Sequence, residues 1–291
     1  MKPSVDDVFK INASSQFEEL ALSVFRYQAM ECEVYSKFLK GLSVLPETIK
    51  KLEEIPFLPI ELFKTHKVKV SEIDKKPMIF TSSGTTAMTQ SKHFVSDVSV
   101  YEKSYLKSFE LFYGNIQDYC ILALLPSYLE RDGSSLIYMV EDLIKKSNHS
   151  DSGFYLNNYD ELISKLNSLQ TNSQKTILIG VTYALLDLSD QFPLYKGGKG
   201  DYKSITIMET GGMKGKRKEM VREELHSTLC KSFGVDKIHS EYGMTELLSQ
   251  AYSKGDGIFN CPPWMKILIR DTNDPFTILP NNKTGGINVI D

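Results

Sequence analysis

The residues best suited to chemistry in this chain form a hydroxyl-rich segment that could bind phosphate. Hydroxyl groups and backbone amides can donate hydrogen bonds to phosphate oxygens, and a glycine lets the backbone approach them closely. Lys92, which follows the segment, adds positive charge. The Walker A pattern GxxxxGK[ST] is absent, and a flexible polar turn explains the same residues equally well. The segment consists of Thr81, Ser82, Ser83, Gly84, Thr85 and Thr86.

A second polar segment, HSEYGMTE, occupies residues 239–246. Tyr242 could stack on a purine, Thr245 could contact a phosphate, and Glu246 could hold Mg²⁺ through its carboxylate oxygens. A plain turn at the end of a strand accounts for Gly243 as well, and this is the favoured interpretation when the segment is considered alone.

The elements that must position both segments alternate between strands and helices. Apolar runs predict strands at 78–81, 119–125, 176–180, 204–210 and, more briefly, 237–238. Helical spacing predicts helices at 15–42, 96–113, 134–146, 160–169 and 216–233. This alternation predicts an α/β fold with a mainly parallel sheet flanked by helices. After residue 247 the pattern changes to short strands and turns, which predicts a small β-rich subdomain over 247–291.

Local signals mark the ends of several elements. Ser15 followed by Glu18 fits a capping box, and Gly114 fits a C-cap. The GGKG sequence at 197–200 is expected to form a surface loop. A basic stretch could attract phosphates, but a solvated helix start is the favoured interpretation. That stretch contains Lys214, Lys216, Arg217 and Lys218.

Composition limits the classes of function. The 291 residues carry a net charge of -3, so no positive excess exists to neutralise the phosphates of a nucleic acid. No uninterrupted apolar run is long enough to span a membrane. The four cysteines form no CxxC pair, which excludes the usual zinc spacings and favours a reducing, cytoplasmic compartment. They are Cys32, Cys120, Cys230 and Cys261, and Cys120 is expected in the core because its neighbours are apolar.

Together, the two polar segments resemble the phosphate loop and the YGxTE motif of the adenylate-forming enzyme superfamily. The chain looks most similar to the acyl-protein synthetase branch, which activates fatty acids in the bacterial luciferase system. The stretches that carry this closer resemblance are FKTH (63–66), LLPSYLERDGSSLIYMV (124–140) and ETGGMKG (209–215). The resemblance implies an adenylation (N-terminal) domain over 1–291, with the β subdomain at its end and without the C-terminal domain of relatives.

The resemblance also implies roles for individual residues. The segment from Thr81 to Thr86 would hold the β- and γ-phosphates, and Thr245 would contact the α-phosphate. Glu246 and Thr85 would bind Mg²⁺, and these two residues would form the catalytic set together with Lys92. The adenine would lie among Gly211, Gly212, Tyr242 and Gly243.

Other positions complete the comparison with the family. Ser127 and Tyr128 would lie near the carboxylate of the acid, although a solvated surface turn with Arg131 and Asp132 explains that stretch equally well. Ala87 stands where relatives have glycine, and Ser91 stands where many have proline. His93 is expected in a loop, whereas His239 either lines the site or is a structural histidine.

The implied function is ATP-dependent activation of a carboxylic acid, by preference a fatty acid, to an acyl-adenylate. The acyl group would then pass to a protein thiol, on an acyl-accepting reductase partner. One alternative is an acyl- or aryl-CoA ligase of the phenylacetate-CoA ligase type. The other belongs to a different class, a non-catalytic nucleotide-binding scaffold subunit, and is motivated by Ala87. Neither Cys230 nor Cys261 is assigned as an acyl carrier.

Overall fold

The structure of this chain is a computed structural model. It describes residues 3–70, 77–83, 89–126, 132–156, 158–191, 202–213 and 215–291. The chain divides into two compact units. Unit 1 comprises residues 1–104, 244–249 and 261–291, and unit 2 comprises residues 105–243 and 250–260. Each unit has its own sheet and core, and each is described separately.

Unit 2 is built on a seven-stranded sheet in the order β4-β3-β5-β6-β7-β8-β9. Strands β4 to β7 in that order run parallel, whereas β8 and β9 are antiparallel. The prediction of a mainly parallel sheet is therefore confirmed. The strands are β3 Cys120–Leu124, β4 Gly153–Phe154, β5 Thr176–Val181, β6 Ile205–Thr210, β7 His239–Tyr242, β8 Ala251–Ser253 and β9 Phe259–Asn260.

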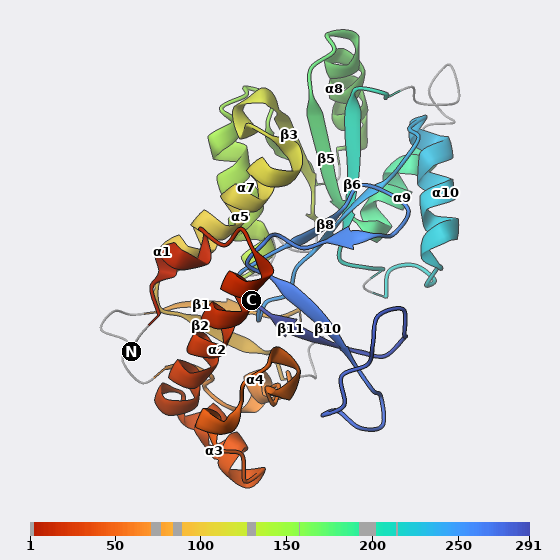
Figure 1. Cartoon of the computed structure of the whole chain (residues 1–291). Coiled ribbons are helices and arrows are strands. Elements are labelled where there is room, and N and C mark those ends of the chain that lie inside the picture. Colours follow the sequence, from red (N-terminus) through yellow and green to blue (C-terminus); the bar gives the residue numbers. More distant parts are fainter. Residues whose placement is uncertain are drawn as a thin grey trace. The chain divides into compact units, whose positions relative to one another are not determined.

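Helices flank this sheet on both faces, as predicted. Figure 1 shows α5 and α7 on one side of the sheet and α9 and α10 on the other. Every residue of β3 and β5 is buried, and both strands are apolar apart from Thr176 at the start of β5. The helices are α5 Val98–Tyr113, α7 Ser135–Ser147, α8 Tyr159–Thr171, α9 Thr182–Gln191 and α10 Arg222–Phe233, with a 3₁₀ turn, η3, at Ile116–Asp118.

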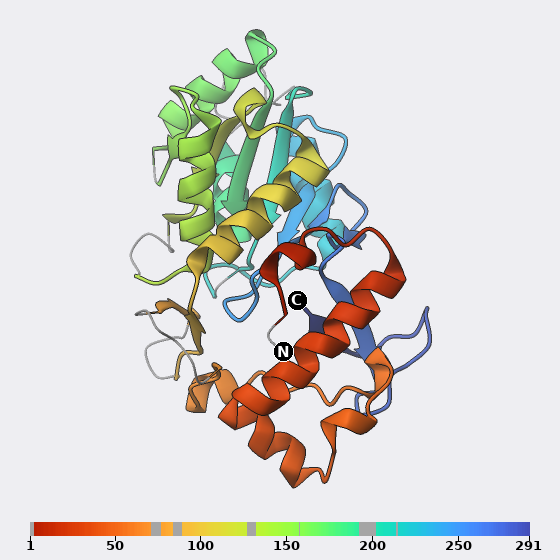
Figure 2. The same cartoon turned by 60° about the vertical axis from the view of Figure 1, so that its left-hand side comes forward.

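Unit 1 packs a helical layer against a small antiparallel ribbon. The helices are α1 Val5–Val8, α2 Ser14–Glu31, α3 Glu33–Gly41 and α4 Leu62–Thr65, with 3₁₀ turns η1 Pro46–Thr48 and η2 Leu52–Glu54. The ribbon pairs β10 Lys266–Arg270 with β11 Gly286–Ile290. Leu268 and Ile290 of this ribbon join the apolar core of α2 and α3, and Figure 2 shows α2 beside the ribbon. The second hairpin pairs β1 Met78–Thr81 with β2 Lys92–Val95.

The prediction of one long helix at 15–42 is wrong in one respect, because the structure has two helices here, separated at Cys32. Cys32 adopts an extended conformation and is buried. The break changes the direction of the chain so that Tyr35 contacts Phe25 edge-on, with ring centroids 6.0 Å apart. The predicted capping box is also wrong, since α2 begins after Ala13 with no side-chain cap hydrogen bond. Packing of aromatic side chains has overridden local helical propensity here.

Two further boundaries differ from the sequence-based expectation. Helix α10 begins at Arg222 rather than near 216, because the guanidinium of Arg217 is held by the carboxylates of Asp187 and Asp190. The basic stretch therefore precedes the helix instead of starting it. The strand expected at 237–238 lies at His239–Tyr242, so the tyrosine of the second segment ends a strand rather than following one.

Gly234 ends α10 in the left-handed region, with φ +65°, and its N–H donates to the carbonyl of Cys230. We expect Gly234→Ala to lower the free energy of unfolding by about 1 kcal/mol, because a Cβ is disfavoured at this φ. Urea unfolding followed by far-ultraviolet circular dichroism measures the change. Gly41→Ala is the control, since Gly41 has no positive φ and a Cβ there meets no atom within 4 Å. Equal effects of the two substitutions would contradict the explanation.

The predicted loop at 197–200 lies outside the described residues. Among the helices that the structure describes, none combines the length and the apolar character required to cross a membrane.

Candidate functional site

Some of the predicted site residues lie outside the described part of the chain. They are Gly84, Thr85 and Thr86 of the first segment, together with Ser127, Tyr128 and Lys214. The residues on either side of the first segment are described, and they show how its two ends are held.

The β1–β2 hairpin of unit 1 brings the two ends of the hydroxyl-rich segment together. Thr81 is paired with Lys92 in the last register position of the hairpin. One residue further on, the N–H of Ser82 donates to the carbonyl of Ser91 at 3.1 Å, and the N–H of Ser91 donates to Oγ of Ser82 at 2.9 Å. The hydroxyl of Ser82 thus bonds across the two ends of the segment, and Ser91 is buried.

His93 connects this hairpin to the second segment. It lies on β2, not in a loop as expected, and its Nδ1–H donates to the carbonyl oxygen of Thr245 at 3.0 Å. The edge of the His93 ring also meets Phe63 of the FKTH stretch, with ring centroids 5.8 Å apart. Burial lowers the pKa of His93, and the Thr245 bond only partly opposes this effect. The imidazole is therefore neutral near pH 7 and links three sequence motifs within unit 1.

The segment that carries Thr245 and Glu246 is held at further points. The N–H of Leu248 donates to Oδ2 of Asp291 at 2.6 Å. The hydroxyl of Ser249 lies 3.1 Å from that of Ser104, which in turn accepts the indole N–H of Trp264 at 3.0 Å. These contacts fix the backbone after Glu246 without using its carboxylate. Sequence reasoning placed His93 in a loop and missed Ser104 and Asp291, because only the fold brings these three residues to this segment.

Lys92 and Glu246 carry charges that the described structure does not neutralise. The side chain of Lys92 is exposed, and Glu246 is half-buried. In the ranges that the structure describes, neither makes an ion pair. A lysine at the end of a loop and a carboxylate on the adjoining segment could oppose phosphate charge and hold a cation, respectively.

Unit 2 brings the glycines of ETGG and the tyrosine of the second segment to the same edge of its sheet. Strands β6 and β7 are parallel neighbours, with Glu209 opposite Ser240, so their carboxyl ends lie together. Gly211 follows the last residue of β6 with φ +71°, and a Cβ at Gly212 would meet no atom within 4 Å. Tyr242 is half-buried and packs edge-on against Phe259, at 6.2 Å between centroids. The carboxyl ends of parallel strands are where ligands bind in open α/β sheets.

A buried carboxylate, Glu209, lies beneath these residues and was not singled out from the sequence. Its side chain accepts hydrogen bonds from Nη1 of Arg222 at 2.8 Å and from the hydroxyl of Thr182 at 3.3 Å. Nε2 of His226 lies 3.7 Å away, too far for a hydrogen bond. Burial acts to raise the pKa of Glu209, but the nearby His226 and Ser240 side chains and the charge of Arg222 outweigh this and hold the pKa below its ordinary value. The carboxylate is therefore ionised and paired.

His239 and the cysteines lie in surroundings that are typical of structural residues. Nδ1 of His239 lies 3.1 Å from the hydroxyl of Tyr113, and burial, with Lys254 and Lys237 nearby, lowers the pKa of the ring to about 4. All four cysteines are free thiols. Cys120 is fully buried, as expected, and burial raises the pKa of its thiol to about 11.

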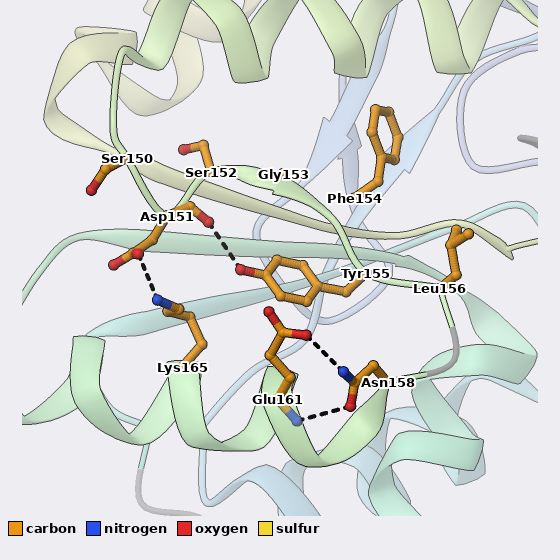
Figure 3. Close-up of a pocket in the computed structure, with 10 residues that line it drawn as sticks. All are labelled: Ser150, Asp151, Ser152, Gly153, Phe154, Tyr155, Leu156, Asn158, Glu161 and Lys165. Carbon is orange, nitrogen blue, oxygen red and sulfur yellow. Dashed lines mark hydrogen bonds and ion pairs between the residues drawn. The ribbon is translucent and has the colours of Figure 1, made fainter.

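A pocket of about 390 Å³ opens beside edge strand β4 in unit 2 (Figure 3). Its wall holds an ion pair between Lys165 and Asp151, at 2.6 Å, and the side chain of Asn158 donates to Glu161. The carboxylates in this wall therefore already have partners. None of the residues predicted from the motifs lines it. The lining residues are Ser150, Asp151, Ser152, Gly153, Phe154, Tyr155, Leu156, Asn158, Glu161 and Lys165.

Two solved structures share the fold. An open conformation of 2-hydroxyisobutyryl-CoA ligase, in complex with 2-HIB-AMP and CoA, is similar over 95% of this chain, with a TM-score of 0.67 and 10% sequence identity. McyG A-PCP complexed with phenylalanyl-adenylate is similar over 99% of this chain, with a TM-score of 0.52 and 14% identity. The chain spans 61% and 52% of the lengths of these two structures.

No family model and no curated protein matches the chain. The structural similarity shows that the chain has the fold of the adenylate-forming ligases, as the sequence motifs implied.

Proposed function

We propose that this chain activates a carboxylic acid with ATP. A carboxylate oxygen of the acid attacks the α-phosphorus, the bond from that phosphorus to the bridging oxygen breaks, and pyrophosphate leaves with the bonding electrons. The product is an acyl-adenylate. The observation that carries the proposal is the bond from His93 to Thr245, because it joins the hairpin of the first segment to the second segment, 152 residues away, inside unit 1.

Two groups of residues would have different tasks in binding ATP. Lys92 and the segment Thr81, Ser82, Ser83, Gly84, Thr85 and Thr86 would hold the β- and γ-phosphates, with Thr245 at the α-phosphate. Gly211, Gly212, Tyr242 and Gly243 would enclose the adenine. Such a reaction needs little acid–base chemistry, since positioning of the reactants and neutralisation of phosphate charge supply most of the rate enhancement.

Mg²⁺ fits the donors present. In proteins that bind nucleotides this ion is held by one or two carboxylates and by the phosphates themselves, rather than by a cage of side chains. Within the described part of the chain, Glu246 offers a carboxylate without an ion-pair partner. Glu246 and Thr85 would hold the ion, which supplies positive charge against the phosphates.

A fatty acid is the proposed substrate, with LPSYLERDGSS at the wall of its pocket. This stretch follows the carboxyl end of β3. The strand order reverses between β3 and β5, because β4 lies on one side of β3 and the later strands lie on the other. Such reversal points are where open α/β sheets bind ligands. Over residues 1–291 the chain would act as an adenylation domain.

The acyl group would pass to a protein thiol on an acyl-accepting reductase, and the reaction would take place in the cytoplasm. Transfer to coenzyme A is the second candidate, favoured by the similarity to a CoA ligase whose structure contains CoA. Product analysis with and without coenzyme A separates the two, since only the second gives an acyl-CoA.

The test of the activity is acid-dependent exchange of pyrophosphate into ATP over a panel of straight-chain fatty acids and aryl acids. Exchange with a fatty acid supports the proposal. Exchange with aryl acids alone would mean that the substrate is an aryl acid and not a fatty acid. If ATP·Mg²⁺ binds in calorimetry but no acid supports exchange, the proposed activity is rejected. The remaining hypothesis is then a non-catalytic nucleotide-binding scaffold.

Lys92→Ala is expected to raise the KM for ATP in this exchange roughly tenfold, since a hydrogen bond to a charged group is lost. The KM for the acid should change little. Lys40→Ala, which removes an exposed lysine on α3, is the matched control for the loss of one positive charge. If both variants shift the KM for ATP equally, general electrostatic attraction explains the result and Lys92 has no specific role.

A further inference from the structure

Two buried carboxylates lie near the carboxyl ends of β6 and β7 in unit 2, and their negative charges are not balanced to the same extent. The exposed fractions of Glu209 and Glu241 are 6% and 7%. Glu209 pairs with Arg222, whereas no lysine or arginine of the described chain lies within ion-pair distance of Glu241. Glu241 accepts a hydrogen bond on Oε2 from the buried hydroxyl of Thr210, at 2.6 Å.

This hydrogen bond joins neighbouring strands. Thr210 is the last residue of β6 and is followed directly by Gly211 and Gly212. Glu241 lies on β7 and is followed directly by Tyr242 and Gly243. The bond therefore fixes the two strand ends that carry the proposed adenine-binding residues.

The other oxygen of Glu241 lies under Gly243. A Cβ built at Gly243 would be only 2.6 Å from Oε1 of Glu241 and 3.6 Å from Cγ of Gln250. Any side chain at position 243 would therefore displace the carboxyl group. Glu241 thus contacts β6 through one oxygen and the turn after β7 through the other.

We propose that Glu241 is a positioning residue of the nucleotide site, which holds Tyr242 and Gly243 at a fixed spacing from Gly211 and Gly212 by means of Thr210. The inference rests on the proposed function, because that function assigns these four residues to the adenine. Glu241 acts through its neighbours, so its loss should weaken binding of ATP without affecting binding of the acid.

The surroundings of Glu241 also make its contact with the two strand ends sensitive to pH. The titratable groups that act on it are Glu209 on β6 and Tyr113 on α5, whereas Arg222 and His226 on α10 contact Glu209 instead. Burial raises the pKa of Glu241 to about 7, the Thr210 hydrogen bond lowers it, and the charge of Glu209 raises it further. Ionisation of Glu241 should therefore change the spacing of the strand ends as the pH rises through neutrality.

The experiment measures ATP·Mg²⁺ affinity by calorimetry, and the KM for ATP and for the acid by pyrophosphate exchange. Thr210→Val should weaken ATP binding roughly tenfold with the KM for the acid unchanged, and Thr210→Ser should bind as the unaltered protein does. Thr182→Val is the matched control, since it removes a buried hydroxyl from Glu209 instead. Glu241→Gln should retain ATP binding near pH 7 and should remove the pH dependence of affinity.

The double variant Thr210→Val/Glu241→Gln should bind ATP no more weakly than Thr210→Val, because both changes act on one contact. If Thr210→Val does not fold, Gly243→Ala provides the second perturbation, since it displaces Glu241 directly and should weaken ATP binding to a similar extent. Equal ATP affinities for Thr210→Val and Thr182→Val would overturn the positioning role while leaving the proposed function intact. Failure of the unaltered protein to bind ATP would instead remove the proposed function, and the positioning role with it.

Discussion

Glu246→Gln is expected to slow acid-dependent pyrophosphate exchange about 100-fold or more. Glutamine keeps the size and the hydrogen-bonding capacity of the side chain, but it removes the negative charge that Mg²⁺ prefers in its oxygen ligands. The loss should be partly recovered at higher Mg²⁺ concentrations, because the variant lowers the affinity for the ion. Exchange rates measured over a series of Mg²⁺ concentrations test both statements.

Stability should change little in this variant. Glu246 makes no ion pair in the described structure, and the backbone around it is held by His93, Asp291 and Ser249 instead. We therefore expect the free energy of unfolding to change by less than about 0.5 kcal/mol. Glu47→Gln, at an exposed position on η1 of the same unit, is the matched control. Exchange within a few-fold of the unaltered rate at every Mg²⁺ concentration would exclude Glu246 as the metal ligand.

The alternation of strands and helices could be predicted from the sequence, because buried positions carry mainly apolar residues. The runs that became β3 and β5 are apolar apart from Thr176, since both faces of these strands are covered. The boundaries that were wrong depend on distant partners. Cys32 interrupts a helical pattern so that Tyr35 can reach Phe25, and α10 starts late because Arg217 is occupied by carboxylates of α9. No local pattern contains those partners.

The same distinction applies to the candidate site. Its two polar segments could be found because their residue types are unusual, and their likeness to a known pair of motifs gave each residue a role. The link between them could not be found. His93 follows a polar loop and is unremarkable in sequence, and only the strand pairing of β1 with β2 turns its ring toward Thr245. Glu209 and Glu241 look like ordinary polar residues at strand ends until the sheet buries them.

The stability of unit 2 should fall as the pH rises through neutrality, and Glu241→Gln should abolish much of this fall. The pKa of Glu241 is raised from 4.5 to about 7 in the folded protein. Between these values the folded state keeps a proton that the unfolded chain has lost, so the free energy of unfolding decreases with pH. The stabilisation is complete below pH 4.5 and is lost above about pH 7, and its full size is about 3 kcal/mol.

A glutamine at position 241 resembles the protonated carboxyl group, accepts the hydrogen bond of Thr210, and does not ionise. Relative to the unaltered protein, the variant should therefore gain about 2 to 3 kcal/mol between about pH 5 and about pH 8. Urea unfolding at several pH values, followed by far-ultraviolet circular dichroism, measures the gain. Glu223→Gln on the exposed side of α10 is the control for loss of one charge from the same unit. A parallel pH dependence in all three proteins would mean that Glu241 is already ionised well below neutrality, and that some other group balances its buried charge.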